Sequence, residues 1–368
     1  MRLHLYLYAL GWLYYTVAPV IIVHFSFFPS ITYSLKVQSF FIITSTLMFF
    51  TFMVGSITAK YVVVSHIKIF NYPLEQKLFG YLSLLTFFIL LCFYIGDLQV
   101  GYGVGENKLI GSLSTFLIIL CFYYLNYFIR SHFMADERKK FLKVLFLSVC
   151  ICGCFLILAG GRLYVLTVIL WILISRFDLG YLTKSKLLLF FAGFIMMAIL
   201  IGQWRLGIDI SIQRFSFYLF AEPLLLYFAT NKYFIAHEIQ LLNYNSDIWS
   251  AFINLVPSFV LPNKDQLYNT LSTQGIVEST FGGVHVVISM LENFGLLGSL
   301  IVSFLAGFSV RKIYITGQRN YTFLNLYYFV CAYSLFLFNR EAFNTQHKVL
   351  LLVLLCSFLQ NKWWKRYA

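Results

Sequence analysis

The sequence predicts an all-α, polytopic membrane protein with about ten transmembrane helices. Its 368 residues are 60% hydrophobic and only 11% charged, and the mean hydropathy is +0.81. Apolar stretches recur along the chain, separated by short loops. A spanning helix needs about 18 or more apolar residues, and in lipid the backbone must satisfy its own hydrogen bonds. We therefore expect one integral membrane domain over residues 1–368.

The expected spans follow one another from the N-terminus. The first has no small-residue cleavage site after its apolar core, so we expect a retained anchor rather than a removed signal. The ten predicted spans are Leu5–Phe28, Val37–Ala59, Phe79–Gly96, Leu109–Tyr127, Val144–Ala159, Leu163–Ser175, Leu187–Ile201, Val286–Val310, Tyr321–Phe338 and Val349–Leu359.

Basic residues divide unevenly between the two sides of this bundle. Of the 27 Lys and Arg, 18 fall on one side and nine on the other. Cytoplasmic loops are enriched in Lys and Arg, so the bias predicts that both termini lie in the cytoplasm. The nine on the outer side are Lys36, Lys108, Arg162, Arg205, Arg214, Lys232, Lys264, Arg340 and Lys348.

A long outer segment, residues 203–285, breaks the regular alternation. It contains two apolar pieces of about 14 residues, Phe215–Phe228 and Ile248–Leu261, each with an internal proline and each below spanning length. We expect in-plane or re-entrant helices here, with twelve spans as the alternative. A large external loop on a rigid bundle is where function usually concentrates.

Composition and motifs exclude several classes of function. The net charge of +13 is explained by cytoplasmic loops, and no basic stretch with exposed aromatics indicates nucleic-acid binding. The sequence has no phosphate-binding P-loop, zinc-ligand spacing or nucleophile elbow. We therefore expect no metal and no cofactor.

Three arginines on the outer side are candidate ligands of an anion. Arg162 follows a Gly-Gly turn between the fifth and sixth spans, and Arg205 and Arg214 lie just after the seventh. The arginine fork donates two parallel hydrogen bonds and keeps its proton, which suits pyrophosphate. The alternatives are lipid headgroup contacts for Arg162, and ion pairs with Asp209 or Glu222 for the other two.

His285 and Glu292 are the candidate catalytic pair. Their seven-residue separation puts both on one face of a helix, two turns apart. A histidine can take a proton from a hydroxyl, and a carboxylate in a membrane needs a partner or water. The alternative is a capping histidine with a structural acid. Arg340, beside Glu341 in the last outer loop, is a fourth candidate pyrophosphate ligand. The alternative is that Arg340 forms a local ion pair with Glu341.

These motifs together resemble Wzy-type O-antigen (oligosaccharide repeat-unit) polymerases and, more distantly, O-antigen ligases. The resemblance covers most of residues 140–310. In the family pattern an Asn follows the histidine, whereas Val286 follows His285 here, and Gly295 is about one residue early. The matching segments are Gly160–Arg162, Trp204–Gly207 with Arg214, Leu255–Pro257, Leu261–Lys264, His285 and Leu291–Gly298.

The resemblance implies an inverting, metal-independent glycosyltransferase at the outer face of the bacterial inner membrane. Donor and acceptor are glycans linked to undecaprenyl pyrophosphate, and membrane lipids and a chain-length regulator protein are further partners. Arginines stabilise the charge on the departing pyrophosphate, and His285 or Glu292 takes the acceptor's proton. The alternatives are an O-antigen ligase, which shares this chemistry, and a lipid-linked oligosaccharide flippase or transporter.

Overall fold

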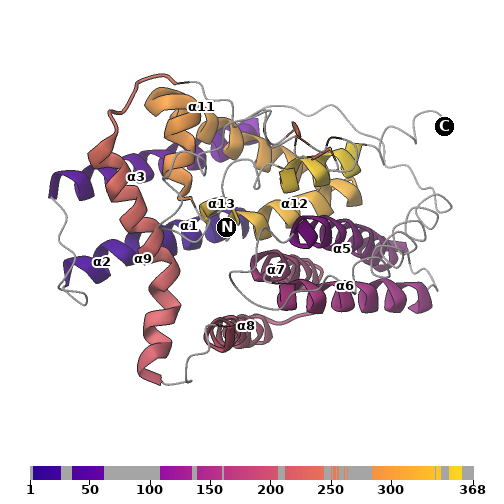
Figure 1. The fold of residues 1–368 in the computed structure, drawn as a ribbon. Coiled ribbons are helices and arrows are strands. Elements are labelled where there is room, and N and C mark those ends of the chain that lie inside the picture. The colour runs from indigo at the N-terminus through magenta and orange to yellow at the C-terminus, as the bar shows by residue number, and fades with distance from the viewer. Residues whose placement is uncertain are drawn as a thin grey trace. The chain divides into compact units, whose positions relative to one another are not determined.

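The computed structural model describes most of the predicted bundle (Figure 1). It covers residues 3–25, 35–61, 108–134, 139–159, 161–205, 212–243, 250, 252–253, 255–256, 261, 263, 284–335, 337–340 and 348–358. These residues contain helices, turns and short connections but no strand, so the all-α prediction is confirmed for them. Four helices in this part of the chain are long and apolar enough to cross a membrane: Leu3–His24, Leu35–Thr58, Leu113–His132 and Val286–Gly317.

Each predicted span that falls on described residues coincides with helix. The span Phe79–Gly96 lies outside the described residues. The observed helices are α1 (Leu3–Trp12), η1 (Leu13–Val17), α2 (Ala18–His24), α3 (Leu35–Thr58), α5 (Lys108–Met134), α6 (Lys139–Ala159), α7 (Arg162–Asp178), α8 (Lys184–Arg205), α9 (Ile212–Ala236), α11 (Val286–Gly317), α12 (Tyr321–Leu335), α13 (Leu337–Arg340) and Lys348–Phe358. A short 3₁₀ turn, η2 (Ala59–Tyr61), follows α3.

The chain divides into two compact units. Unit 1 comprises Met1–Ser65, Ser216–Ile313 and Tyr333–Leu352, and contains α1 to α3, α13 and most of α9 and α11. Unit 2 comprises His66–Phe215, Tyr314–Ala332 and Val353–Ala368, and contains α5 to α8 and most of α12. Each unit has its own apolar core.

Two prolines in unit 1 free backbone carbonyls that other elements then contact. Proline has no N–H, so the carbonyl four residues earlier loses its α-helical donor. Pro223 lies inside α9, and the freed carbonyl of Leu219 accepts a hydrogen bond from the Tyr14 hydroxyl. Pro19 follows the π-helical turn η1 and frees the carbonyl of Tyr15 in the same way. Such replacement partners allow proline inside apolar helices.

The first apolar piece of the outer segment, Phe215–Phe228, lies within a longer helix. The α9 helix runs through Pro223 and covers 25 residues, to Ala236. The helix therefore includes part of the stretch expected to connect the two apolar pieces. Its continuation is possible because Tyr14 satisfies the carbonyl that the proline leaves open. Most of the second piece, Ile248–Leu261, lies outside the described residues.

Helices α3 and α11 pack closely through two glycines. A Cβ on Gly55 would meet the carbonyl of Phe304, and a Cβ on Gly307 would meet the carbonyl of Phe52. The opposite face of α3 carries exposed apolar side chains at a seven-residue spacing, Ile43, Phe50 and Ile57. Small residues inside and large apolar residues outside are typical of a helix in lipid.

This crossing predicts a large effect of a single methyl group. In the Gly307→Ala variant the new Cβ overlaps the α3 backbone, which cannot rotate away as a side chain can. We expect the free energy of unfolding to fall by about 1–3 kcal/mol, measured as a lower melting temperature of the detergent-solubilised protein. The matched control is Gly193→Ala in α8, where a Cβ meets nothing within 4 Å. Equal melting temperatures for the two variants would contradict the close crossing.

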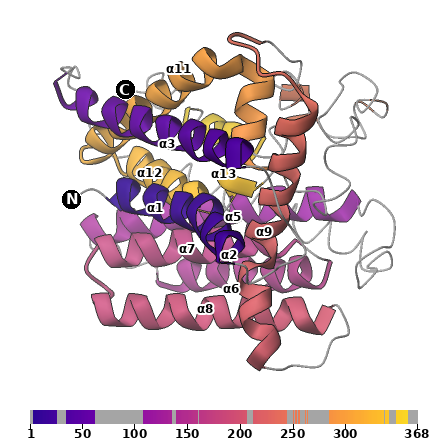
Figure 2. The ribbon, with the colours of Figure 1, turned by 90° about the vertical axis from the view of Figure 1, so that its left-hand side faces the viewer.

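Unit 2 contains a tight helical hairpin that runs from α7 to α8. Gly180, at φ +79°, ends α7, and the N–H of Tyr181 donates to the carbonyl of Arg176. This left-handed glycine and the 6→1 hydrogen bond are the usual way to terminate a helix before a reversal. Figure 2 shows α6, α7 and α8 side by side, and α7 contacts both of the others.

Buried polar side chains connect the other helices of unit 2. Asn325 of α12 donates its amide to the carbonyl of Phe122, at 2.9 Å, and to Oδ1 of Asn126, also at 2.9 Å. The indole of Trp171 donates to the carbonyl of Asn325 at 3.2 Å. These hydrogen bonds fix α5, α7 and α12 in register, because in an apolar interior an unmade hydrogen bond is costly.

Candidate functional site

The α11 helix of unit 1 is broken at Gly295. This residue has φ 68° and ψ −175°, a conformation that essentially only glycine adopts. Backbone from the segment after α9 fills the break: the N–H of Leu296 donates to the carbonyl of Gln240 at 3.0 Å, and that of Leu297 to Leu241 at 2.9 Å. The first N–H groups of the second half of α11 are thus satisfied by the chain itself.

Glycine is also required at this position by lack of space. A Cβ on Gly295 would lie 2.6 Å from Cα of Leu242 and 2.7 Å from the backbone N of Asn243. Residues Gln240–Asn243, the insert segment, lie against this break. The contact brings two stretches that are about 50 residues apart in sequence into direct backbone hydrogen bonding.

Glu292 lies one turn before the break and is held by two partners. The phenol of Tyr233, on α9, donates to Oε1 of Glu292 at 2.5 Å. The side-chain amide of Asn243 donates to the backbone carbonyl of Glu292 at 2.8 Å. Glu292 is only partly buried, and among the described residues Oε2 accepts no hydrogen bond. Among the described residues, one carboxylate oxygen is therefore fixed, by Tyr233.

His285 precedes α11 and is almost fully buried, with 1% of its surface exposed. Its Nδ1 accepts a hydrogen bond from the N–H of Val287 at 3.2 Å, so the ring caps the helix. In the neutral imidazole the proton is then on Nε2. Nε2 is buried and makes no well-aligned hydrogen bond. The backbone of Tyr15, whose carbonyl Pro19 leaves without a helical donor, lies close enough to the ring to raise its pKa slightly.

The charge state of His285 follows from this environment. Burial lowers the pKa of His285 from 6.5 to about 4, and the nearby Tyr15 backbone only partly offsets that shift. The ring of Phe41, on α3, packs edge-on against the imidazole with centroids 5.1 Å apart. An apolar wall of this kind disfavours the imidazolium, so His285 is neutral at pH 7.

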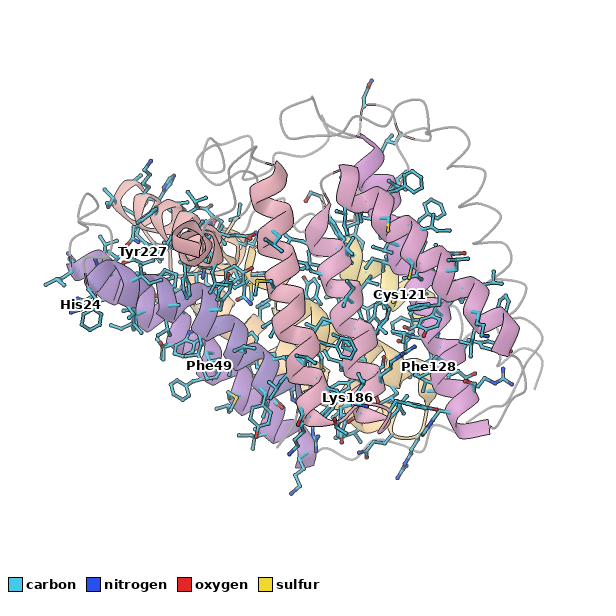
Figure 3. The ribbon with its side chains drawn as sticks, turned by 90° about the horizontal axis from the view of Figure 1, so that it is seen from below. His24, Phe49, Cys121, Phe128, Lys186 and Tyr227 are labelled. Atoms are coloured by element: carbon cyan, nitrogen blue, oxygen red, sulfur yellow. The ribbon has the colours of Figure 1, made fainter. Side chains whose placement is uncertain are left out.

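Both candidates adjoin the same helix. Phe41 packs against His285 and also against Tyr227 of α9. The ring centroids of Phe41 and Tyr227 are 5.6 Å apart. Figure 3 shows Tyr227 beside the indigo ribbons of the N-terminal helices. Tyr233, the partner of Glu292, is six residues further along α9. The α9 helix thus contacts Glu292 through Tyr233 and is linked to His285 through the Phe41 ring.

The four candidate arginines lie at helix ends, and their side chains lie outside the part that the structure describes. Arg162 begins α7 and Arg205 ends α8. These two helices are consecutive and antiparallel, so their backbones reach the same end of the hairpin. Arg214 is in the first turn of α9, and Arg340 ends α13. By unit, Arg340 belongs with His285 and Glu292, and the other three belong to unit 2.

The Gly-Gly-Arg turn is as short as the sequence suggests. The α6 helix ends at Ala159 and α7 begins at Arg162, so two glycines make the whole connection. The N–H of Gly161 donates to the carbonyl of Leu156 at 2.8 Å, which closes the end of α6. Arg162 is therefore attached to the N-terminal turn of a helix, where backbone N–H groups favour anions.

Sequence inspection missed two residues of this site, Tyr233 and Asn243. Tyr233 lies in a stretch expected to connect two apolar pieces, and the sequence gives no sign that it is paired with an acid 59 residues later. Asn243 has no motif around it. Gly295 was part of a recognised run, but its broken-helix geometry has no signature that distinguishes it from a packing glycine.

Comparison with protein-family models, curated proteins and solved structures finds no match to this chain.

Proposed function

We propose that this chain is an inverting, metal-independent membrane glycosyltransferase that polymerises oligosaccharide repeat units carried on polyprenyl pyrophosphate. The sequence resemblance suggests the reaction and places it at the outer face of the bacterial inner membrane. The observation that carries the proposal is Glu292, a carboxylate in a broken apolar helix with one oxygen held by Tyr233. An acid within a membrane helix, fixed and accessible, is the usual sign of a functional site.

In the proposed reaction Glu292 is the general base. The acceptor sugar hydroxyl gives its proton to Oε2, and its oxygen forms a bond to the anomeric carbon of the donor glycan. The bond from that carbon to the pyrophosphate oxygen breaks, and the pyrophosphate leaves with the electron pair. From the sequence, the groups proposed to stabilise this negative charge through paired N–H donors are Arg162, Arg205, Arg214 and Arg340.

His285 has a different part in this proposal. Its Nδ1 is occupied by the Val287 N–H, and its Nε2 carries the ring proton, so neither nitrogen is ready to accept one. A group with a pKa of about 4 is also a weak base at neutral pH. We assign proton acceptance to Glu292 and treat His285 as a positioning residue at the start of α11.

The arginine assignment gives the test of the proposed function. Arg162→Ala, Arg205→Ala and Arg214→Ala should each stop formation of long glycan chains while single lipid-linked repeat units accumulate. Losing one preorganised donor to a developing oxyanion lowers a rate by about 10²–10³-fold. Glycan lengths are resolved by gel electrophoresis of a host that makes the repeat unit, and Lys186→Ala is the control. Normal chain lengths in all three variants would refute the proposal.

A flippase or transporter of lipid-linked oligosaccharide is the second candidate, because broken helices are common at transporter binding sites. In such sites the helix end points at the substrate. In α11, however, the N–H groups of Leu296 and Leu297 are already hydrogen-bonded to the insert segment. This favours a structural break that positions Glu292. An O-antigen ligase would use the same chemistry with a different acceptor.

A further inference from the structure

We propose that Tyr233 is a positioning residue for Glu292, and that the insert segment Gln240–Asn243 completes its support. This inference rests on the proposed function, since it assigns a role to the surroundings of the general base. Tyr233 does not touch the reacting atoms in this role. It acts through the hydrogen bond from its hydroxyl to Oε1 of Glu292, which is 2.5 Å long.

The geometry restricts the carboxylate in two independent ways. The Tyr233 hydroxyl sets the rotation of the Glu292 side chain by binding Oε1, and Asn243 holds the Glu292 backbone by donating to its carbonyl at 2.8 Å. Both partners come from the same stretch of chain, the end of α9 and the segment that follows. A base whose side chain and backbone are both held loses less freedom when it meets the substrate.

Tyr233 is itself held in place. Its ring stacks on the His237 imidazole, with centroids 4.7 Å apart and an angle of 17° between the planes. His237 and Glu238 are exposed, whereas only 4% of the Tyr233 surface is exposed. The phenol is therefore presented to Glu292 from a buried ring under an exposed histidine, and it has little freedom to turn away.

The phenol hydrogen bond also decides which carboxylate oxygen meets the substrate. With Oε1 bound by the Tyr233 hydroxyl, Oε2 is the oxygen left for the acceptor hydroxyl. Removing the phenol should release the rotation of the carboxylate, while the groups that bind the substrates stay in place.

The experiment compares Tyr233→Phe with Tyr14→Phe in the purified, reconstituted full chain supplied with lipid-linked repeat units. Tyr14 also donates a hydroxyl hydrogen bond to α9, but to the carbonyl of Leu219, whereas Tyr233 donates to Glu292. For Tyr233→Phe we expect kcat to fall about 10–100-fold, the size of one hydrogen bond to a charged group. KM should stay within about twofold.

Asn243→Ala is the second variant, and it should lower kcat in the same direction. Tyr14→Phe should lower the melting temperature without changing kcat. A Tyr233→Phe enzyme with unchanged kcat, alongside an inactive Glu292→Gln enzyme, would overturn the positioning role alone. A raised KM with unchanged kcat would also overturn it, since Tyr233 would then bind substrate. A wild-type chain that joins no repeat units would overturn the proposed function itself.

Discussion

Glu292→Gln is expected to lower the rate of glycan joining by about 10²–10⁴-fold, the usual contribution of a general base. Gln keeps the size and shape of Glu and can still accept the Tyr233 hydrogen bond through its amide oxygen. It cannot take a proton from the acceptor hydroxyl. The purified variant should therefore fold and bind lipid-linked glycan as the wild type does, with the loss confined to kcat.

His285→Asn is the informative comparison for this variant. Asn is a good helix cap, so it can replace the hydrogen bond from the Val287 N–H to Nδ1. It leaves a gap against Phe41, however, and we expect a lower melting temperature with kcat reduced far less than in Glu292→Gln. Full activity in Glu292→Gln, together with complete inactivity of a folded His285→Asn protein, would reverse the assignment of the base.

Gly295→Ala should be the most destabilising of the glycine substitutions. Two penalties add here: a backbone conformation that costs about 1–3 kcal/mol for any other residue, and a Cβ placed 2.6 Å from Cα of Leu242. Relief of the overlap requires the insert segment to separate from α11, which breaks the hydrogen bonds to Leu296 and Leu297. We expect the free energy of unfolding to fall by about 2–6 kcal/mol in total, which is enough to leave little folded protein in the membrane.

Gly180→Ala separates the two penalties. Gly180 also has positive φ, at 79°, but a Cβ there meets nothing within 4 Å. The free energy of unfolding of the Gly180→Ala variant should fall by about 1 kcal/mol, from backbone strain alone. The melting temperatures of the two variants and the wild type, measured in the same detergent, test this difference. Equal losses at the two positions would mean that the insert segment does not press on the α11 break.

The helical architecture could be predicted because lipid imposes a simple length rule on apolar runs. The predicted span Val37–Ala59 and the helix Leu35–Thr58 differ by two residues at the start and one at the end. The rule fails where polar residues continue a helix. The α9 helix extends past Phe228 through Thr230, Asn231 and Lys232, and hydropathy gives no reason to include them. Thr230 and Asn231 fit because their side chains donate to carbonyls of their own helix.

The candidate site could be predicted only in part, and for a physical reason. Glu292 attracts attention in the sequence because a charge in an apolar run is costly. Tyr233 does not, because a tyrosine in an apolar helix is ordinary, and only tertiary packing brings its hydroxyl to Glu292. The capping of α11 by His285 was recognised as one alternative, and the Val287 N–H does donate to Nδ1. The part played by the four arginines remains a prediction.

The most direct test of the central claim is reconstitution of the purified chain in vesicles loaded with one lipid-linked repeat unit and no energy source. The proposed chemistry predicts a ladder of longer glycans, release of one polyprenyl pyrophosphate for each bond formed, and no requirement for a divalent cation. Repeat units that cross the bilayer without being joined, or vesicles in which no glycan is extended, would contradict it.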